Sequence, residues 1–178
     1  MPGNDIVSDW FDQYGDDIYH FLLYRVGPKD AEDLVQEVFL KAFKAADKFQ
    51  YQSSPRTWLY SVARNVANDE FRKRKSRKRA DLLSFDGTLD IPSTDTPESI
   101  FYGNEEAQRI SRAIQSLKSN YQEVLILRGI KELSIKETAE ILSWSESKVR
   151  STQTRARRAL IQQLGGWESD GEEFSEYR

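Results

Sequence analysis

One short segment combines side chains that could read base edges in duplex DNA. Its basic and hydroxyl residues recur at steps of three and four, or stand beside those positions: Lys148, Arg150, Ser151, Thr152, Thr154 and Arg155. An α-helix repeats every 3.6 residues, so this spacing gathers them on one side of a helix. Arginine can pair with a guanine edge through two hydrogen bonds, and hydroxyls can meet bases or phosphates. The segment indicates a DNA-reading helix, although a basic surface helix in a bundle would show the same spacing.

The residues ahead of this helix strengthen the DNA interpretation. Ser134 and Glu137 have the spacing of a capping box, which opens a short helix ending near Leu142. Residues 143–145 read as a tight turn, with Ser145 placed to cap the next helix. In a helix-turn-helix, the second helix enters the major groove by its N-terminal part. A capped helix, a tight turn and a basic helix in this order predict that motif.

A second basic segment continues a helix in the first half of the chain. Residues 71–80 hold seven basic and no acidic residues. The apolar face of the helix before them repeats at Leu59, Val62 and Val66. Its opposite side is a polar stripe of basic and amide side chains: Arg64, Asn65, Asn68 and Arg72. Such side chains suit phosphates and base edges.

Three aromatic residues stand near this stripe in the sequence: Tyr51, Trp58 and Tyr60. Aromatic rings beside basic side chains are the ingredients for stacking on unpaired bases. Trp58 fits a buried core position equally well, so periodicity leaves its role open.

A third polar stripe lies on the helix expected over residues 31–46. Its members stand off the apolar face at steps of three and four: Asp33, Gln36, Glu37 and Lys41. Ordinary solvated charge and a protein-binding surface both fit this pattern.

Composition excludes several classes of protein. The 178 residues include no cysteine and one histidine, which excludes disulfide scaffolds, thiolate metal sites and histidine-rich metal sites. The nine glycines are scattered, so no phosphate-binding loop is apparent. The net charge of −3 conceals two basic stretches, residues 71–80 and 143–164, with an acidic stretch between them. This asymmetry indicates nucleic-acid binding at two places.

The same patterns predict an all-α fold of two small helical domains. Helical periodicity fills the first 75 residues in three segments, and Gly27-Pro28 ends the first of them. Glycine and proline interrupt the pattern after residue 76, and four further helices follow from about residue 104. The expected organisation is a three-helix-type bundle, a flexible acidic linker, a helix-turn-helix domain and an acidic tail, over residues 1–77, 78–103, 104–165 and 166–178.

Three motifs resemble bacterial sigma factors of the sigma-70 family. DAEDLVQEVFLKAF at 30–43 is similar to their region 2.2, and SPRTWLYSVARN at 54–65 to regions 2.3–2.4. Residues 117–128, LSIKETAEIL at 133–142 and RARRAL at 155–160 resemble region 4. A chain with only these two regions looks like an extracytoplasmic-function sigma factor, with sigma region 2 in residues 1–77 and region 4 in 104–165.

The resemblance implies a role for each matching position. Residues expected to bind the clamp helices of the largest polymerase subunit are Asp33, Leu34, Gln36 and Glu37. Residues expected to capture the −10 strand are Gln50, Tyr51, Gln52, Ser53, Ser54, Trp58, Tyr60, Arg64, Asn65, Asn68 and Arg72. Residues expected to read the −35 duplex are Lys148, Arg150, Ser151, Thr154 and Arg155.

The resemblance also implies the partners. They are core RNA polymerase, including the flap of its second-largest subunit, promoter DNA, and an anti-sigma factor that in this family is often membrane-bound. The expected protein is a cytoplasmic specificity subunit with no catalytic residue, metal or cofactor of its own. A classical activator or repressor is the alternative, but it would not require the motifs at 30–43 and 54–65. An enzyme is a weaker alternative, because no metal-ligand spacing or nucleotide-binding loop is apparent.

Overall fold

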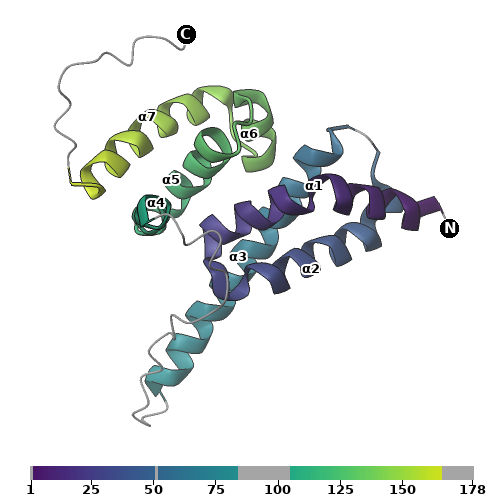
Figure 1. The fold of residues 1–178 in the computed structure, drawn as a ribbon, viewed down its shortest axis with the longest axis horizontal. Coiled ribbons are helices and arrows are strands. Elements are labelled where there is room, and N and C mark those ends of the chain that lie inside the picture. The colour runs from purple at the N-terminus through teal and green to yellow at the C-terminus, as the bar shows by residue number, and fades with distance from the viewer. Residues whose placement is uncertain (1, 51, 84–104, 166–178) are drawn as a thin grey trace.

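The protein is described by a computed structural model over residues 2–50, 52–83 and 105–165 (Figure 1). Within these ranges the chain forms helices joined by short turns, without a strand. In chain order the elements are α1 (Pro2–Val26), α2 (Pro28–Ala45), η1 (Ala46–Lys48), α3 (Pro55–Leu83), α4 (Glu105–Gln115), α5 (Ser119–Val124), η2 (Leu125–Ile130), α6 (Ile135–Leu142) and α7 (Glu146–Gln163). The predicted all-α fold is confirmed. We call α1–α3 the N-terminal domain and α4–α7 the C-terminal domain.

The N-terminal domain is a three-helix bundle held by apolar side chains at helical spacing. Ile18 and Phe21 of α1, Val38 of α2, and Leu59 of α3 are completely buried. Each such side chain contributes about 1.5–3 kcal/mol when it leaves water. The stripes predicted from the sequence therefore form the core that orients the polar faces of α2 and α3.

The turn between α1 and α2 depends on a glycine. Gly27 has φ +90°, a backbone conformation that residues with a Cβ rarely adopt. Pro28 then starts α2, where its fixed φ suits the first helical position. Together they reverse the chain within one residue and set α1 and α2 side by side; the sequence predicted the helix end at Gly27-Pro28.

Helix α3 is longer than expected. It runs to Leu83 without interruption, so residues 78–83 are helical, and the linker predicted to begin at 78 does not begin there. The segment is rich in Arg, Lys, Ala and Leu, which favour helix, and the next glycine in the sequence is Gly87. The remainder of the predicted linker and the predicted acidic tail lie outside the described residues.

The C-terminal half of α3 is fixed to the α1–α2 turn by one arginine. Arg74 donates to the Val26 carbonyl at 3.1 Å and pairs with Glu70 at 3.0 Å and with Asp30. The basic segment is thus divided in function. Arg74 joins helices together, whereas its neighbours Arg72, Lys73 and Lys75 are exposed.

The C-terminal domain has the predicted helix-turn-helix. Ser134 accepts a hydrogen bond from the Glu137 amide at 3.1 Å, and the Glu137 carboxylate accepts one from the Ser134 amide at 2.7 Å. Ser143 adopts the left-handed conformation that ends α6, and Ser145 caps α7 by accepting from the Lys148 amide. Both helix starts predicted from the sequence are confirmed.

The helix before this motif differs from the prediction. One continuous helix was expected near residues 124–128, but α5 gives way after Val124 to the π-helical segment η2. Three consecutive apolar side chains there, Leu125, Ile126 and Leu127, are all buried. Burial is continuous from Gln122 of α5 through Leu127, so this part of the chain is enclosed on all sides across the change of helix type.

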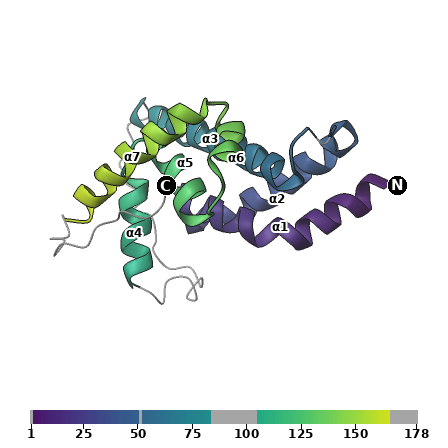
Figure 2. The same ribbon diagram turned by 90° about the horizontal axis from the view of Figure 1, so that it is seen from above.

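The two domains lie directly against each other. Helix α3 packs on α6, and α1 packs on α4 and η2. Figure 2 shows the C-terminal domain seated over α1 and α3, with the far end of α2 left uncovered. The sequence predicted two domains joined by a linker and contained no signal for this contact.

Loss of the capping box tests the fold of the helix-turn-helix. Replacing Ser134 with Ala should cost about 1 kcal/mol in the free energy of unfolding, because the orphan amide of Glu137 loses its acceptor. Chemical denaturation followed by circular dichroism measures the change. Ser147→Ala, at an exposed position inside α7, is the matched control and should leave stability within about 0.5 kcal/mol. Equal stability of both variants would contradict the capping assignment.

Candidate nucleic-acid and protein interfaces

The outer face of α7 presents the basic and hydroxyl side chains expected to read DNA. Five of the residues in that prediction are exposed: Lys148, Arg150, Ser151, Thr154 and Arg155. Thr152, which the spacing also placed there, is 5% exposed and packs inward with Val149 and Ala156. The face is therefore narrower than the sequence pattern indicated.

Local contacts orient this face. The Lys148 ammonium lies 4.1 Å from the Trp144 ring centroid, and the Arg150 guanidinium pairs with Glu146 at 3.1 Å. The hydroxyls of Ser151 and Thr154 donate to carbonyls of their own helix, both at 3.2 Å. A hydroxyl used in this way offers its remaining lone pairs as acceptors, which suits the amino groups of adenine and cytosine.

The polar stripe of α3 is divided between solvent and the C-terminal domain. Asn65 and Arg72 are exposed. Arg64 pairs through Nε with Glu123 of α5 at 2.8 Å, and the Asn68 amide oxygen accepts from Arg25 at 3.4 Å. Of these four residues, Arg64 is the one that forms an ion pair with the C-terminal domain, whereas Asn68 bonds to Arg25 of α1 and lines a cavity between the domains.

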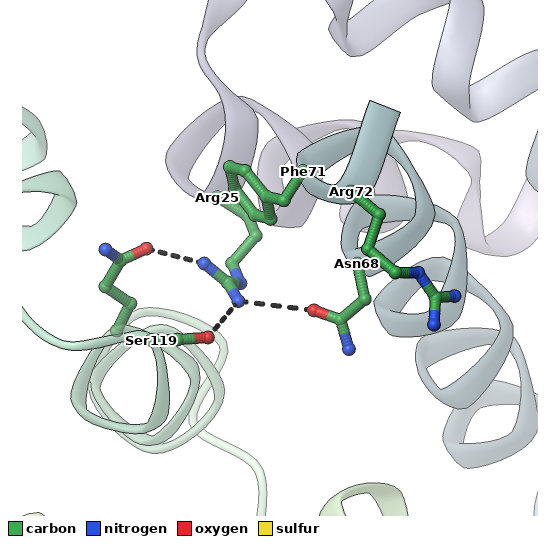
Figure 3. Close-up of a pocket in the computed structure, with 6 residues that line it drawn as sticks. Arg25, Asn68, Phe71, Arg72 and Ser119 are labelled. Carbon is green, nitrogen blue, oxygen red and sulfur yellow. Dashed lines mark hydrogen bonds between the residues drawn. The ribbon is translucent and has the colours of Figure 1, made fainter. Parts of the chain in front are cut away.

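Arg25 is the central residue of the domain contact, and sequence reasoning missed it. The periodicity placed it on the apolar stripe of α1, where its side chain is indeed 2% exposed. Its guanidinium donates to Gln122 Oε1 and to Ser119 Oγ, both at 2.6 Å (Figure 3). It also lies 3.7 Å from the Glu123 carboxylate. Burial lowers the pKa of Arg25, and the Glu123 carboxylate opposes that shift.

A second polar contact joins the domains near the start of α3. Asp17 pairs with Lys131 at 2.7 Å and with Arg56 at 3.3 Å, and Arg56 also reaches the Lys131 carbonyl. Burial alone would raise the pKa of Asp17, but its hydrogen bonds and ion pairs with these two cations outweigh burial and lower it. Asp17 thus forms ion pairs with a cation of each domain, Arg56 of the N-terminal and Lys131 of the C-terminal domain.

The aromatic residues assigned to the −10 strand occupy unequal positions. Trp58 is half-buried, with its ring 5.0 Å from Phe49 and 5.7 Å from Trp10. Tyr60 is completely buried against Phe21, and burial raises the pKa of its hydroxyl. Its ring is not presented to a strand in this arrangement, contrary to the prediction, because it points into the bundle.

The loop before α3 is partly ordered by its own side chains. Gln52 donates to the Gln50 side chain at 3.1 Å, and Ser54 accepts from the Thr57 amide at 3.1 Å. Gln52 and Ser54 are exposed and Ser53 is half-buried. Tyr51 lies outside the described residues, so its predicted role stays a prediction.

The face of α2 predicted for protein binding points to solvent. Asp33 and Gln36 are exposed, and Glu37 pairs with Lys41 at 3.0 Å. Leu34 is 5% exposed and belongs to the core, so it cannot present its side chain to a partner as predicted. Its position one step from Asp33 turns it to a different side of the helix.

An apolar patch that the sequence analysis missed adjoins this face. Leu40 is 60% exposed and Phe43 48% exposed, and Leu40 follows Gln36 and Glu37 by four and three residues. The sequence does contain a signal for this patch, because Leu40 is an apolar residue at helical spacing from the polar residues Gln36 and Glu37. Surface apolar groups beside charges are a common composition for a protein interface.

The described residues contain no group of three or more potential metal ligands. No helix among them is long and apolar enough to span a membrane.

Comparison with known proteins finds two matching family models, both for regions of sigma-70 factors. Residues 10–77 match Sigma-70 region 2, and residues 107–160 match Sigma-70, region 4. The ECF RNA polymerase sigma factor SigX of Bacillus subtilis (strain 168) is 39% identical over 153 residues, covering 84% of this chain and 79% of SigX. RNA polymerase sigma factor YlaC of the same organism is 35% identical over 161 residues, covering 90% of this chain and 92% of YlaC.

The fold agrees with these matches. The sigma factor RpoE, solved in complex with the anti-sigma factor NepR from Bartonella quintana, has a TM-score of 0.71 and 25% identity to this chain. The similarity covers 88% of this chain and 95% of that one. With both regions matched in order and relatives aligned over most of their lengths, the chain belongs to the sigma-70 family, as an RNA polymerase sigma factor of the extracytoplasmic-function type.

Proposed function

We propose that this sigma factor binds core RNA polymerase through α2, reads the −35 duplex with α7 and captures the −10 strand with α3. The observation that carries the proposal is the exposed basic and hydroxyl face of α7, on a chain that also has a complete region 2 bundle. In a helix-turn-helix, such a face lies in the major groove. The chain acts on promoters in the cytoplasm, where core polymerase is found.

The proposal requires no catalytic group in this chain. RNA synthesis belongs to core polymerase, and strand separation at −10 results from differential binding. Unpairing a base costs a few kcal/mol, which stacking and a captured base can offset. The basic and amide side chains along α3, together with the Gln50–Ser54 loop, are the groups we assign to that strand.

The face of α2 has the composition expected for a polymerase contact. Asp33, Gln36 and Glu37 supply polar groups, and Leu40 and Phe43 supply apolar area beside them. Exposed apolar side chains bring binding energy by leaving water, whereas rim charges mainly set partner choice and association rate. We therefore add Leu40 to the residues assigned to the clamp helices, and assign the flap to the C-terminal domain.

Regulation by an anti-sigma factor is part of the proposal. The RpoE structure similar to this chain is a complex with the anti-sigma factor NepR. We infer that an anti-sigma factor, in this family often anchored in the membrane, covers the polymerase-binding face of this chain. The apolar patch at Leu40 and Phe43 is a surface that such a protein would shield.

Charge reversal on α2 tests the polymerase contact. The triple variant Asp33→Lys, Gln36→Lys, Glu37→Lys should abolish co-purification with core polymerase and stay folded, because all three side chains lie outside the core. Loss of the Glu37–Lys41 ion pair should cost only about 0.5 kcal/mol of stability. The matched control reverses three exposed acids of α1, Asp9→Lys, Asp12→Lys and Asp16→Lys, and should still bind. Undiminished co-purification of the α2 variant would refute the assignment.

Arginine truncation on α7 tests −35 recognition. Arg150→Ala and Arg155→Ala should each cost about 1–3 kcal/mol of promoter binding if they read base edges. Promoters with single substitutions across −35 locate the affected positions, with binding followed by gel shift of the polymerase complex. Arg158→Ala, farther along α7, is the control and should show no loss at particular positions. A uniform loss on every sequence would show that Arg150 and Arg155 contact phosphates only.

A further inference from the structure

Two arginines of the N-terminal domain converge on one carboxylate of the C-terminal domain. Arg64 Nε lies 2.8 Å from Glu123 Oε1, and Arg25 Nη2 lies 3.7 Å from the same oxygen. The Glu123 side chain is 4% exposed. Among the described residues, Glu123 is the one carboxylate within ion-pair distance of either arginine. The contact thus sets two positive charges against a single negative charge.

Both positive charges belong to the N-terminal domain, and the negative charge belongs to the C-terminal domain. If the C-terminal domain moved away, Arg25 and Arg64 would keep their places on α1 and α3 but lose Glu123, Gln122 and Ser119 together. Uncompensated guanidinium groups that are close together form a strong site for an anion. A phosphodiester carries the same charge as a carboxylate and accepts the same paired hydrogen bonds from arginine.

A cavity already opens beside Arg25. It has a volume of about 400 Å³ and is lined by Arg25, Asn68, Phe71 and Arg72 of one domain and by Ser119 and Gln122 of the other (Figure 3). The Nε of Arg25 has no hydrogen-bond partner among the described atoms. The guanidinium of Arg25 lies over the Phe71 ring at 4.6 Å, which fixes its orientation toward the domain contact.

We propose that Arg25 and Arg64 form a binding site for backbone phosphates of the −10 strand, and that the Glu123 carboxylate occupies this site when the two domains are packed together. The inference rests on the proposed function, since Arg64, Asn68 and Arg72 are residues we assign to that strand. It adds Arg25, which no motif assigned, and gives the domain contact a role: DNA and the C-terminal domain compete for one anion site.

Competition follows from burial. A strand cannot reach Arg25, which is 2% exposed, or the inner side of Arg64 while Glu123 is in place. Strand binding therefore requires the C-terminal domain to leave, and the apparent affinity is reduced by the fraction of chains that are open. A sigma factor free of polymerase is thereby hindered from binding exposed single strands elsewhere.

Neutralising the carboxylate tests the competition. The full-length chain is titrated into a fluorescein-labelled single-stranded oligonucleotide of mixed sequence, and binding is followed by fluorescence anisotropy. Glu123→Gln should bind about three- to tenfold more tightly than the wild type, since it opens more chains. Glu140→Gln, an exposed acid of α6, removes the same charge from the same domain and should bind as the wild type does.

A second substitution tests the phosphate contact itself. Adding Arg25→Gln to Glu123→Gln should reverse the gain in affinity. It should also reduce the salt dependence of binding by about 0.7 in log–log slope, because one phosphate is no longer neutralised. If Glu123→Gln fails to fold by circular dichroism, Glu123→Asp replaces it. The shorter side chain cannot span both arginines, so this variant should also bind more tightly.

The results separate this inference from the proposed function. Wild-type affinity in a folded Glu123 variant, or an unchanged affinity and salt slope on adding Arg25→Gln, would overturn the inference. Promoter-dependent transcription by the wild-type chain with core polymerase is measured in parallel and depends on neither outcome. Failure of that transcription would overturn the proposed function instead.

Discussion

The arrangement of the two domains depends on the buried ion cluster of Arg25, Arg64 and Glu123. Taking charges out of water is costly, and an ion pair in a protein interior compensates only when its geometry is good and its other polar atoms are bonded. Gln122 and Ser119 supply those additional bonds to Arg25. The contact therefore adds less to stability than to specificity, because this docking lets Gln122, Ser119 and Glu123 bind Arg25 together, although Arg25 Nε stays without a hydrogen-bond partner among the described residues.

Helix α3 connects this contact to the surface proposed for the −10 strand. Leu59, Ala63 and Val66 hold it in the bundle, and Arg64 and Asn68 face the C-terminal domain. Its exposed basic end extends beyond the bundle (Figure 1), away from the docked domain. Helix α3 thus carries the bundle face, the domain contact and the exposed basic end on one continuous helix. A change in domain docking therefore alters the surface offered to DNA without refolding the bundle. The α2 face, which lies on the far side of the bundle, is independent of that docking.

The sequence predicted the helices well because their signals are local. Apolar periodicity, the Gly27-Pro28 stop and the capping box at Ser134 each act within a few residues, so they can be read without knowing the fold. The candidate site was predictable to the extent that its residues belong to motifs: the α7 face and the α2 stripe are exposed as expected. Leu34, Tyr60 and Thr152 were assigned to surfaces but are buried, since residues adjacent on a helix point in different directions.

What the sequence could not predict arises from contacts between distant segments. Arg25 and Glu123 are separated by the whole linker, and nothing in either local pattern indicates that they meet. A charged residue on an apolar stripe was the one visible anomaly, and its partner could be found only in three dimensions. The π-helical segment η2 was likewise not predicted, since local propensity favours an α-helix over its buried residues Leu125–Leu127.

The central claim is that Glu123 holds the free chain closed and that single-stranded DNA binds only when the C-terminal domain moves away. The distance between spin labels at Glu32→Cys on α2 and Gln162→Cys on α7 measures this directly by pulsed electron resonance. The sequence has no other cysteine to react, and both positions are exposed. We expect one narrow distance distribution for the free chain, and longer distances both with saturating single-stranded oligonucleotide and in the Glu123→Gln variant. A broad distribution for the free wild-type chain, or the same distribution with and without the oligonucleotide, would contradict this account.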